Sequence, residues 1–201
     1  MGRKLMVIGV SLGANRMTNL LGELGDTDLI HAACILSAPH KLWIATEAAK
    51  TAFDGFYDKA LGKNVANLYL KHEHVLKDRF KEEFDIDLRE TIESMEPIRL
   101  TEIDDKIASK IYGYEDMYDY HYKAACCWAI PNIRVPTLFM NALDDPLIDE
   151  TVIDFDAIKA NEHCILATSK TGGHVGYFES FFGEKNWCRK PVLDFLYLLS
   201  I

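Results

Sequence analysis

Short apolar runs alternate with segments of helical periodicity over much of this chain. Leu5–Ile8 and Ala32–Leu36 are continuous apolar runs of the length that a buried parallel strand needs. Between them, Asn15–Leu24 carries its leucines and a methionine at helical spacing. The order strand, helix, strand predicts a parallel sheet with right-handed crossovers.

The same pattern returns in the last third of the chain. Thr137–Asn141 and His163–Ala167 are predicted as a third and a fourth strand, with a helix over Val152–Lys159 between them. A last amphipathic helix is predicted over Trp187–Leu199. The fold class is therefore α/β: a mostly parallel sheet of about four strands with flanking helices.

The segment 43–125 differs from both flanks, because it contains helical spacing and no clear strand. We expect it to be a helical insertion within one domain that spans 1–201, and to act as a lid over the site. The alternative is a set of ordinary packing helices. Its aromatic residues are more often core than ligand contacts, so none receives a substrate role.

A serine stands between two glycines at the first strand-to-helix junction, in Gly9-Val10-Ser11-Leu12-Gly13. This G-x-S-x-G pattern is typical of a nucleophile elbow, a strained turn that exposes the serine hydroxyl above the sheet. A side chain at either glycine is expected to crowd the neighbouring strand and helix. The backbone N–H of Leu12 lies at the positive end of the helix, where an oxyanion can be stabilised. The alternative is a tight turn with an idle serine.

Two further reactive groups, Asp145 and His174, each follow a predicted strand. The carboxyl ends of parallel strands meet at one edge of a sheet, so Ser11, Asp145 and His174 should lie together there. His174 would take the proton of the Ser11 hydroxyl, and Asp145 would orient the imidazole. Asp144 competes with Asp145, which we prefer because it stands three residues before an apolar anchor, Ile148.

The other histidines have simpler interpretations. His72 and His74 are two residues apart on a predicted helix and cannot face one point. The remaining ones lack flanking glycines and are interpreted as surface or loop residues: His31, His40, His121 and His163. The acidic stretch 144–156 lacks the spacing and the central glycine of a calcium loop, so neither a metal nor a cofactor is expected.

Composition narrows the partners. The 201 residues carry a formal net charge of −9, which argues against nucleic acid or strongly anionic membranes as partners. Five cysteines without C-x-x-C spacing predict free thiols in a reducing compartment instead of disulfides or zinc. Met1–Leu12 has a basic start and an apolar run, like a short signal peptide, but the elbow already explains that run. No apolar stretch has the length needed to cross a bilayer, so the chain is expected to be soluble or peripheral.

With these residues assembled, the chain resembles α/β-hydrolase family four, which includes bacterial esterases and animal acylglycerol lipases and phospholipases, and it looks closest to the animal monoacylglycerol lipase branch. The resemblance rests on four stretches: VIGVSLGANRMTNLLGELG, LTEIDDKIASKIYGYEDMYDY, IRVPTLFMNALDDPLIDE and TGGHVGYFES. It implies hydrolysis of lipid esters by Ser11, His174 and Asp145, and it implies membrane association, although no anchor is seen in this chain. Peripheral membrane contact through the lid is a further expectation.

The chain departs from that family at two points. Ala14 stands where relatives usually have a second glycine, a change that we expect to be tolerated. Members of the family have about half a domain ahead of the elbow, including a histidine–glycine loop that supplies the other oxyanion donor. We therefore expect a shortened domain in which Leu5–Ile8 is an open, apolar edge strand. Loss of one oxyanion donor costs about 3 kcal/mol.

Three functions follow from these observations. The first is a serine carboxylic ester hydrolase of the lipase or esterase type. The second is a catalytically weak or inactive shortened hydrolase that binds a lipid, a steroid or a partner protein. The third is an acyl transferase that passes the acyl group to an alcohol with the same three residues.

Overall fold

The chain forms two compact units in the computed structural model, which describes residues 4–180 and 185–201. One unit combines the residues up to Ala45 with those from Ala124 onward, and the other is Thr46–Lys123. The second unit is thus inserted between two strands of the first. It lies within the segment 43–125 that we predicted to be helical.

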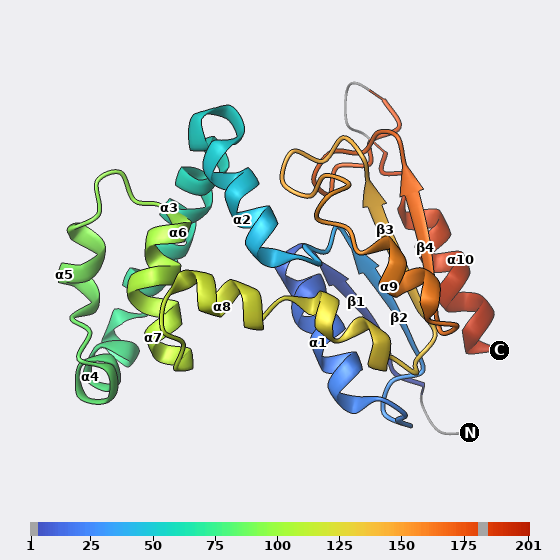
Figure 1. Ribbon diagram of the computed structural model, residues 1–201, viewed down its shortest axis with the longest axis horizontal. Coiled ribbons are helices and arrows are strands. Elements are labelled where there is room, and N and C mark those ends of the chain that lie inside the picture. Colours follow the sequence, from blue (N-terminus) through green and yellow to red (C-terminus); the bar gives the residue numbers. More distant parts are fainter. Residues whose placement is uncertain (1–3, 181–184) are drawn as a thin grey trace. The chain divides into compact units, whose positions relative to one another are not determined.

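The first unit contains one sheet of four parallel strands in the order β1-β2-β3-β4 (Figure 1). The strands are β1 (Met6–Val10), β2 (Ala32–Leu36), β3 (Thr137–Ala142) and β4 (Cys164–Ser169). All four predicted strands are present, with bounds shifted by at most two residues. The predicted fold class is therefore confirmed.

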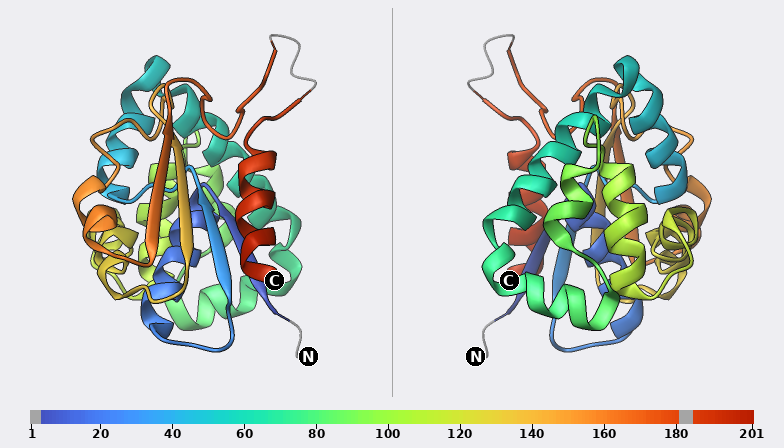
Figure 2. Two further views of the ribbon diagram at one scale, coloured as in Figure 1. Left: turned by 90° about the vertical axis from the view of Figure 1, so that its right-hand side faces the viewer. Right: turned by 90° about the vertical axis from the view of Figure 1, so that its left-hand side faces the viewer.

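Helices cover both faces of this sheet. The helices are α1 (Leu12–Leu24), α9 (Phe155–Ala160) and α10 (Arg189–Ser200). One buried cluster joins α1 and α9 to the sheet around Phe139, and a second joins α10 to the other face around Met140. Figure 2 shows α10 on its own side of the strands. The alternation of neighbouring β3 residues between the two clusters is the reason that every residue of this central strand is buried.

The helix predicted over Val152–Lys159 is shorter than expected. It begins at Phe155 because the Asp154 carboxylate accepts a hydrogen bond from the Ala157 N–H at 3.2 Å and so caps the first turn. β1 lies at one end of the strand order and pairs with β2; Leu5, which precedes β1, and Ile8 within it are 54% and 48% exposed.

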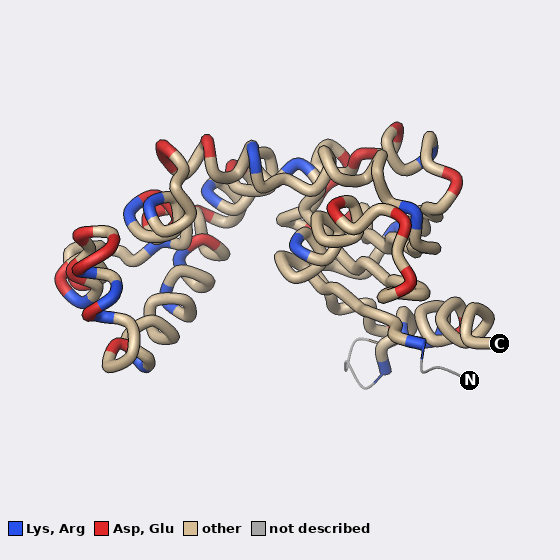
Figure 3. The backbone as a smooth tube through the Cα atoms, turned by 90° about the horizontal axis from the view of Figure 1, so that it is seen from below, with Lys and Arg blue, Asp and Glu red and all other residues tan. Residues whose placement is uncertain are grey.

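The second unit is helical and has its own core. Its helices are α2 (Leu42–Thr51, which begins in the first unit), α3 (Phe56–Lys71), α4 (Glu73–Phe84), α5 (Leu88–Glu93), α6 (Leu100–Ile103), α7 (Ser109–Tyr112) and α8 (Met117–Lys123), with a π-helical turn at Asp104–Ala108. The core gathers Phe80, Leu88, Ile92, Ile103 and Ile107. Basic and acidic residues are interspersed along the backbone of this unit (Figure 3), and exposed side chains form ion pairs such as Arg79–Glu83. Exposed pairs of this kind contribute little to stability, so the apolar core holds this unit together.

Two histidines that we interpreted as surface or loop residues are buried. The interpretation was wrong for His121, which lies in α8, whereas His40 lies in a loop, as expected, but is not at the surface. His121 is 3% exposed, and its ring links the Thr46 hydroxyl, 2.7 Å from Nδ1, to the Asp104 carboxylate, 2.9 Å from Nε2. His40 is fully buried beside Phe139, with ring centroids 5.4 Å apart. Its Nδ1 accepts a hydrogen bond from the Asp154 N–H at 3.0 Å. A histidine that finds a polar partner can enter a core, and local sequence does not reveal the partner.

Among the described residues, no helix combines the length and the apolar character that a bilayer crossing requires.

Burial of His40 gives the first unit a definite acid sensitivity. The pKa of His40 is lowered from 6.5 to about 3, mainly because the ring is buried and to a smaller extent because of the positive charge of Lys41. Between these pH values the unfolded chain binds a proton that the folded chain does not, so the free energy of unfolding falls as the pH falls. The slope from this one group approaches about 1.4 kcal/mol per pH unit. We expect His40→Gln to remove most of that slope when unfolding by urea is measured between pH 6.5 and 4.5.

His31→Gln is the matched control, because His31 is exposed. Equal slopes for the unsubstituted chain and His40→Gln would contradict the prediction.

Candidate active site

Ser11 lies between β1 and α1 in a strained conformation. Its φ of 53° and ψ of −125° are unusual for a residue with a side chain, and its N–H donates to the Leu36 carbonyl at 2.9 Å. A Cβ at Gly9 would lie 2.8 Å from the Cα of Ala14, so the absence of a side chain lets α1 cross β1 closely. A Cβ at Gly13 would meet nothing within 4 Å. The expectation of crowding is therefore right for Gly9 and wrong for Gly13.

Asp145 follows β3 in a tight turn and is held by backbone donors. Its Oδ1 accepts hydrogen bonds from the N–H groups of Leu147 at 2.9 Å and Ile148 at 3.2 Å. The side chain of Asp145 is 1% exposed, and Ile148 is buried in the core, as the choice of this residue over Asp144 assumed. Because these two donors bind Oδ1, the other carboxylate oxygen, Oδ2, remains available to a partner outside the turn.

His174 connects the two other side chains. Its Nδ1 lies 2.7 Å from Oδ2 of Asp145, and its Nε2 lies 2.8 Å from Oγ of Ser11. The structure thus brings together all three residues that we selected from the sequence. With Asp145 ionised, Nδ1 carries the imidazole proton, and Nε2 is left to accept the Ser11 O–H. This arrangement can draw a proton from a hydroxyl group.

Asp144 has a different partner. Its Oδ1 accepts a hydrogen bond from the Gly173 N–H at 2.8 Å, next to His174 in the chain. The carboxylate that contacts the imidazole is therefore that of Asp145, while Asp144 contacts the backbone of the loop that carries it. Ile148 indicated from the sequence which acid contacts the imidazole, but nothing in the sequence indicated the bond between Asp144 and the Gly173 N–H.

The cysteines are poor competitors for the role of nucleophile. All five thiols are free, and Cys164 is the least buried of them. Burial raises the pKa of Cys34 to about 12 and that of Cys127 to about 11, so both remain protonated near neutral pH. Within the described residues, no group of three or more His, Cys, Asp or Glu side chains is placed to hold a metal ion.

The sequence matches known proteins over almost its whole length. It is 32% identical over 198 residues to a monoacylglycerol lipase of Saccharomyces cerevisiae, and the match covers 96% of this chain and 42% of the lipase. It is 30% identical over 202 residues to monoacylglycerol lipase ABHD2 of Danio rerio, and this match covers 96% of this chain and 46% of that protein. The chain spans about half the length of the curated relatives it matches. No family model matches the chain.

Solved structures share the fold. An esterase of Pyrococcus furiosus superposes with a TM-score of 0.54 at 14% identity, covering 100% of this chain and 55% of the esterase. A proline iminopeptidase of Mycobacterium smegmatis gives a TM-score of 0.55 at 11% identity, covering 98% of this chain and 66% of the peptidase. The chain therefore has the fold of these two enzymes. The relatives named monoacylglycerol lipase match the branch of the α/β-hydrolases that the sequence motifs implied.

The hydrogen bonds of Asp145 predict the effect of replacing its carboxylate with an amide. In Asp145→Asn, the Leu147 and Ile148 N–H groups hold the amide oxygen, so the NH₂ group faces Nδ1 of His174. Nδ1 must then accept, and the proton moves to Nε2, where it opposes the Ser11 hydroxyl. We expect ¹⁵N–¹H correlation spectra of the imidazole to show the Nε2–H tautomer in this variant.

Asp144→Asn is the control, because an amide oxygen can still accept from the Gly173 N–H. An unchanged tautomer in Asp145→Asn would show that this carboxylate does not determine the state of the ring.

Proposed function

We propose that this chain carries the catalytic residues of a serine carboxylic ester hydrolase that acts on lipid esters of the acylglycerol type. The observation that carries the proposal is the pair of hydrogen bonds that joins Ser11 to His174 and His174 to Asp145, at 2.8 and 2.7 Å. The same three residues occupy the order and the strand ends that nucleophilic acyl transfer requires in this family.

The chemistry follows from the protons. As Oγ of Ser11 bonds to the acyl carbon, its proton passes to Nε2 of His174, and the Asp145 carboxylate stabilises the imidazolium. The ester C–O bond then breaks, and Nε2 returns the proton to the leaving alkoxide. Water attacks the acyl-enzyme by the same route and releases a fatty acid and free Ser11.

The carbonyl oxygen becomes negative during both attacks. Leu12 is the first residue of α1, and the first N–H groups of a helix have no acceptor within the helix. The Leu12 N–H, directly after the nucleophile, is therefore proposed as an oxyanion donor, where one such donor is worth about 3 kcal/mol.

The substrate class is proposed from the relatives. Two of them are named monoacylglycerol lipases, and both match over nearly all of this chain. A neutral glycerol ester also suits a protein with a net charge of −9, which would repel an anionic substrate.

Labelling of the nucleophile tests the proposal. We expect a fluorophosphonate probe to react with the 201-residue chain at Ser11, and Ser11→Ala to abolish both the labelling and the release of fatty acid from monooleoylglycerol. The expected loss of turnover is at least about a thousandfold, because the hydroxyl is the attacking group. The matched control is Ser94→Ala, on an exposed surface of the helical unit. Equal labelling of Ser11→Ala and the unsubstituted chain would refute the assignment.

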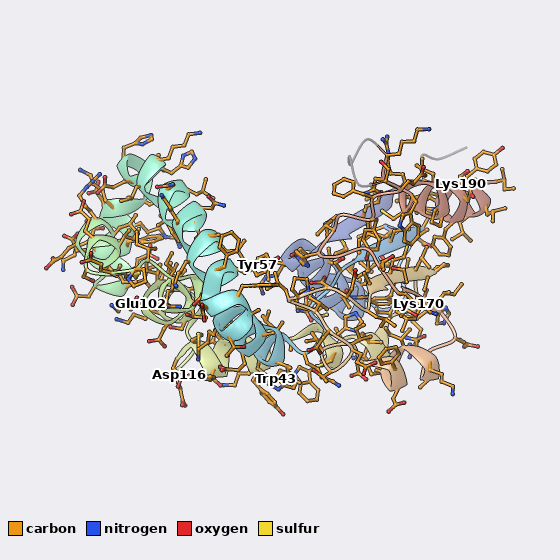
Figure 4. The ribbon with its side chains drawn as sticks, turned by 90° about the horizontal axis from the view of Figure 1, so that it is seen from above. Trp43, Tyr57, Glu102, Asp116, Lys170 and Lys190 are labelled. Carbon is orange, nitrogen blue, oxygen red and sulfur yellow. The ribbon has the colours of Figure 1, made fainter. Side chains whose placement is uncertain are left out.

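We also propose that the helical unit contacts the lipid surface. Phe53 and Phe56 are 71% and 61% exposed, and both pack edge-on against Tyr57, which projects from the first turn of α3 (Figure 4). The bend between α2 and α3 puts Phe53 and Asp54 at positive φ. Exposed aromatic side chains on a tight bend are suited to insertion at a lipid interface.

Vesicle binding tests this contact. We expect Phe53→Ser combined with Phe56→Ser to weaken binding to phosphatidylcholine vesicles at least about tenfold, because each phenylalanine contributes roughly 1.5–3 kcal/mol when its surface leaves water. Val75→Ser is the control, since Val75 is also highly exposed, at 67%, but lies on α4 and outside the bend that carries Phe53 and Phe56. Equal co-sedimentation of the double variant and the unsubstituted chain would exclude this surface.

A further inference from the structure

The turn that carries Ser11 is anchored at the end of β2. The Ser11 N–H donates to the Leu36 carbonyl at 2.9 Å, and Leu36 is the last residue of that strand. The next residue, Ser37, is fully buried with a φ of 50°, and its N–H donates to the Met140 carbonyl of β3 at 2.8 Å. The backbone beside the nucleophile is thus fixed to both neighbouring strands.

The loop that carries His174 reaches the same point through Tyr177. The Tyr177 side chain is buried, and its hydroxyl oxygen lies 3.1 Å from Oγ of Ser37. The same hydroxyl donates to the Met140 carbonyl at 3.4 Å, which leaves Ser37 to donate to the phenol oxygen. Burial raises the pKa of Tyr177, so the phenol stays neutral and its proton is available for the bond to the Met140 carbonyl.

The backbone of the loop makes Tyr177 its closing residue. The Tyr177 N–H donates to the Gly172 carbonyl at 2.8 Å, which encloses His174 between the two ends. A Cβ at Gly172 would lie 2.7 Å from the Tyr177 ring, so glycine leaves the space that the ring fills. Trp187 and the Tyr177 ring pack edge to face, with centroids 5.3 Å apart.

The loop is also strained. Val175 and Tyr177 have φ values of 68° and 47°, a region that costs a residue with a side chain about 1–3 kcal/mol. Such a conformation persists only where surrounding contacts hold it. The buried hydroxyl pair of Tyr177 and Ser37 is a contact of this kind, and it ties the strained loop to the strand end that also holds the Ser11 backbone.

We propose that Tyr177 and Ser37 are positioning residues, whose shared hydrogen bond sets the separation between the His174 imidazole and the Ser11 hydroxyl. The two side chains act through His174 and do not contact the reacting atoms. Proton transfer depends steeply on that separation, and a misplacement of about 1 Å can cost a hundredfold in rate. The inference rests on the proposed function for its effect on rate, while its effect on the imidazole is independent of any activity.

Two conservative variants of the 201-residue chain test the proposal. Tyr177→Phe keeps the ring and removes only the hydroxyl, and Ser37→Ala removes the partner. Tyr197→Phe is the matched control, because Tyr197 is 67% exposed on α10. Thermal unfolding of each variant separates a loss of fold from a loss of position.

The first readout is the NMR signal of the hydrogen-bonded ring proton of His174, assigned by comparison with His174→Gln. We expect Tyr177→Phe and Ser37→Ala each to shift this signal, because the hydrogen bonds of the ring to Asp145 and Ser11 change in length. Tyr197→Phe should leave the signal unchanged. An unaltered signal in Tyr177→Phe would overturn the proposal.

The second readout is the rate of fluorophosphonate labelling at Ser11. We expect each single variant to slow labelling at least about tenfold, because each removes the buried hydrogen bond between Tyr177 and Ser37. The double variant should be no slower than Tyr177→Phe, since that variant has already lost the bond that Ser37→Ala removes. Losses that multiply would overturn the proposal, because the two residues would then act separately. A shifted ring-proton signal in a protein that never labels would support the positioning role and refute the hydrolase.

Discussion

The parallel register of the sheet is the constraint on which the candidate site depends. Val10 pairs with Leu36, Leu36 with Met140, and Met140 with Ala167, so the strands that precede Ser11, Asp145 and His174 end at the same edge. A shift of one strand by one residue would turn its side chains to the opposite face. Burial of β2 and β3 on both faces makes such a shift costly, and the 2.7 and 2.8 Å contacts of His174 follow from that rigidity.

Much of this arrangement could be predicted from the sequence. Continuous apolar runs mark buried strands because both faces of a parallel sheet are covered, and four such runs gave the four strands. Ser11, Asp145 and His174 could be selected because each follows one of these runs, and parallel topology converts that position in the chain into a common place in space. Ile148 discriminated between the two adjacent acids, since an apolar anchor fixes the backbone donors that hold Asp145.

The remaining features depend on partners that lie far away in the sequence. Nδ1 of the buried His40 finds its partner 114 residues later, in the Asp154 N–H, while Nε2 has no hydrogen-bond partner among the described residues, and no pattern around residue 40 indicates this. The same is true of the Ser37–Tyr177 pair, whose members are 140 residues apart. Gly13 shows the opposite error, because a motif glycine was taken to be sterically required where the space is open. Pattern reasoning locates elements well, but it does not identify which polar groups find each other inside the core.

The hydrogen bond between Thr46 and His121 has a consequence for how the inserted unit can vary. These residues are 75 positions apart, yet they stand at the beginning and near the end of that unit, with the hydroxyl 2.7 Å from the ring. The hydrogen bond therefore joins the two ends of the inserted unit. The loop-closure entropy of the β2–β3 connection then hardly depends on the length of chain between them. Longer or different helices between Thr46 and His121 would therefore leave the strand register, and the sheet edge that carries Ser11, unchanged.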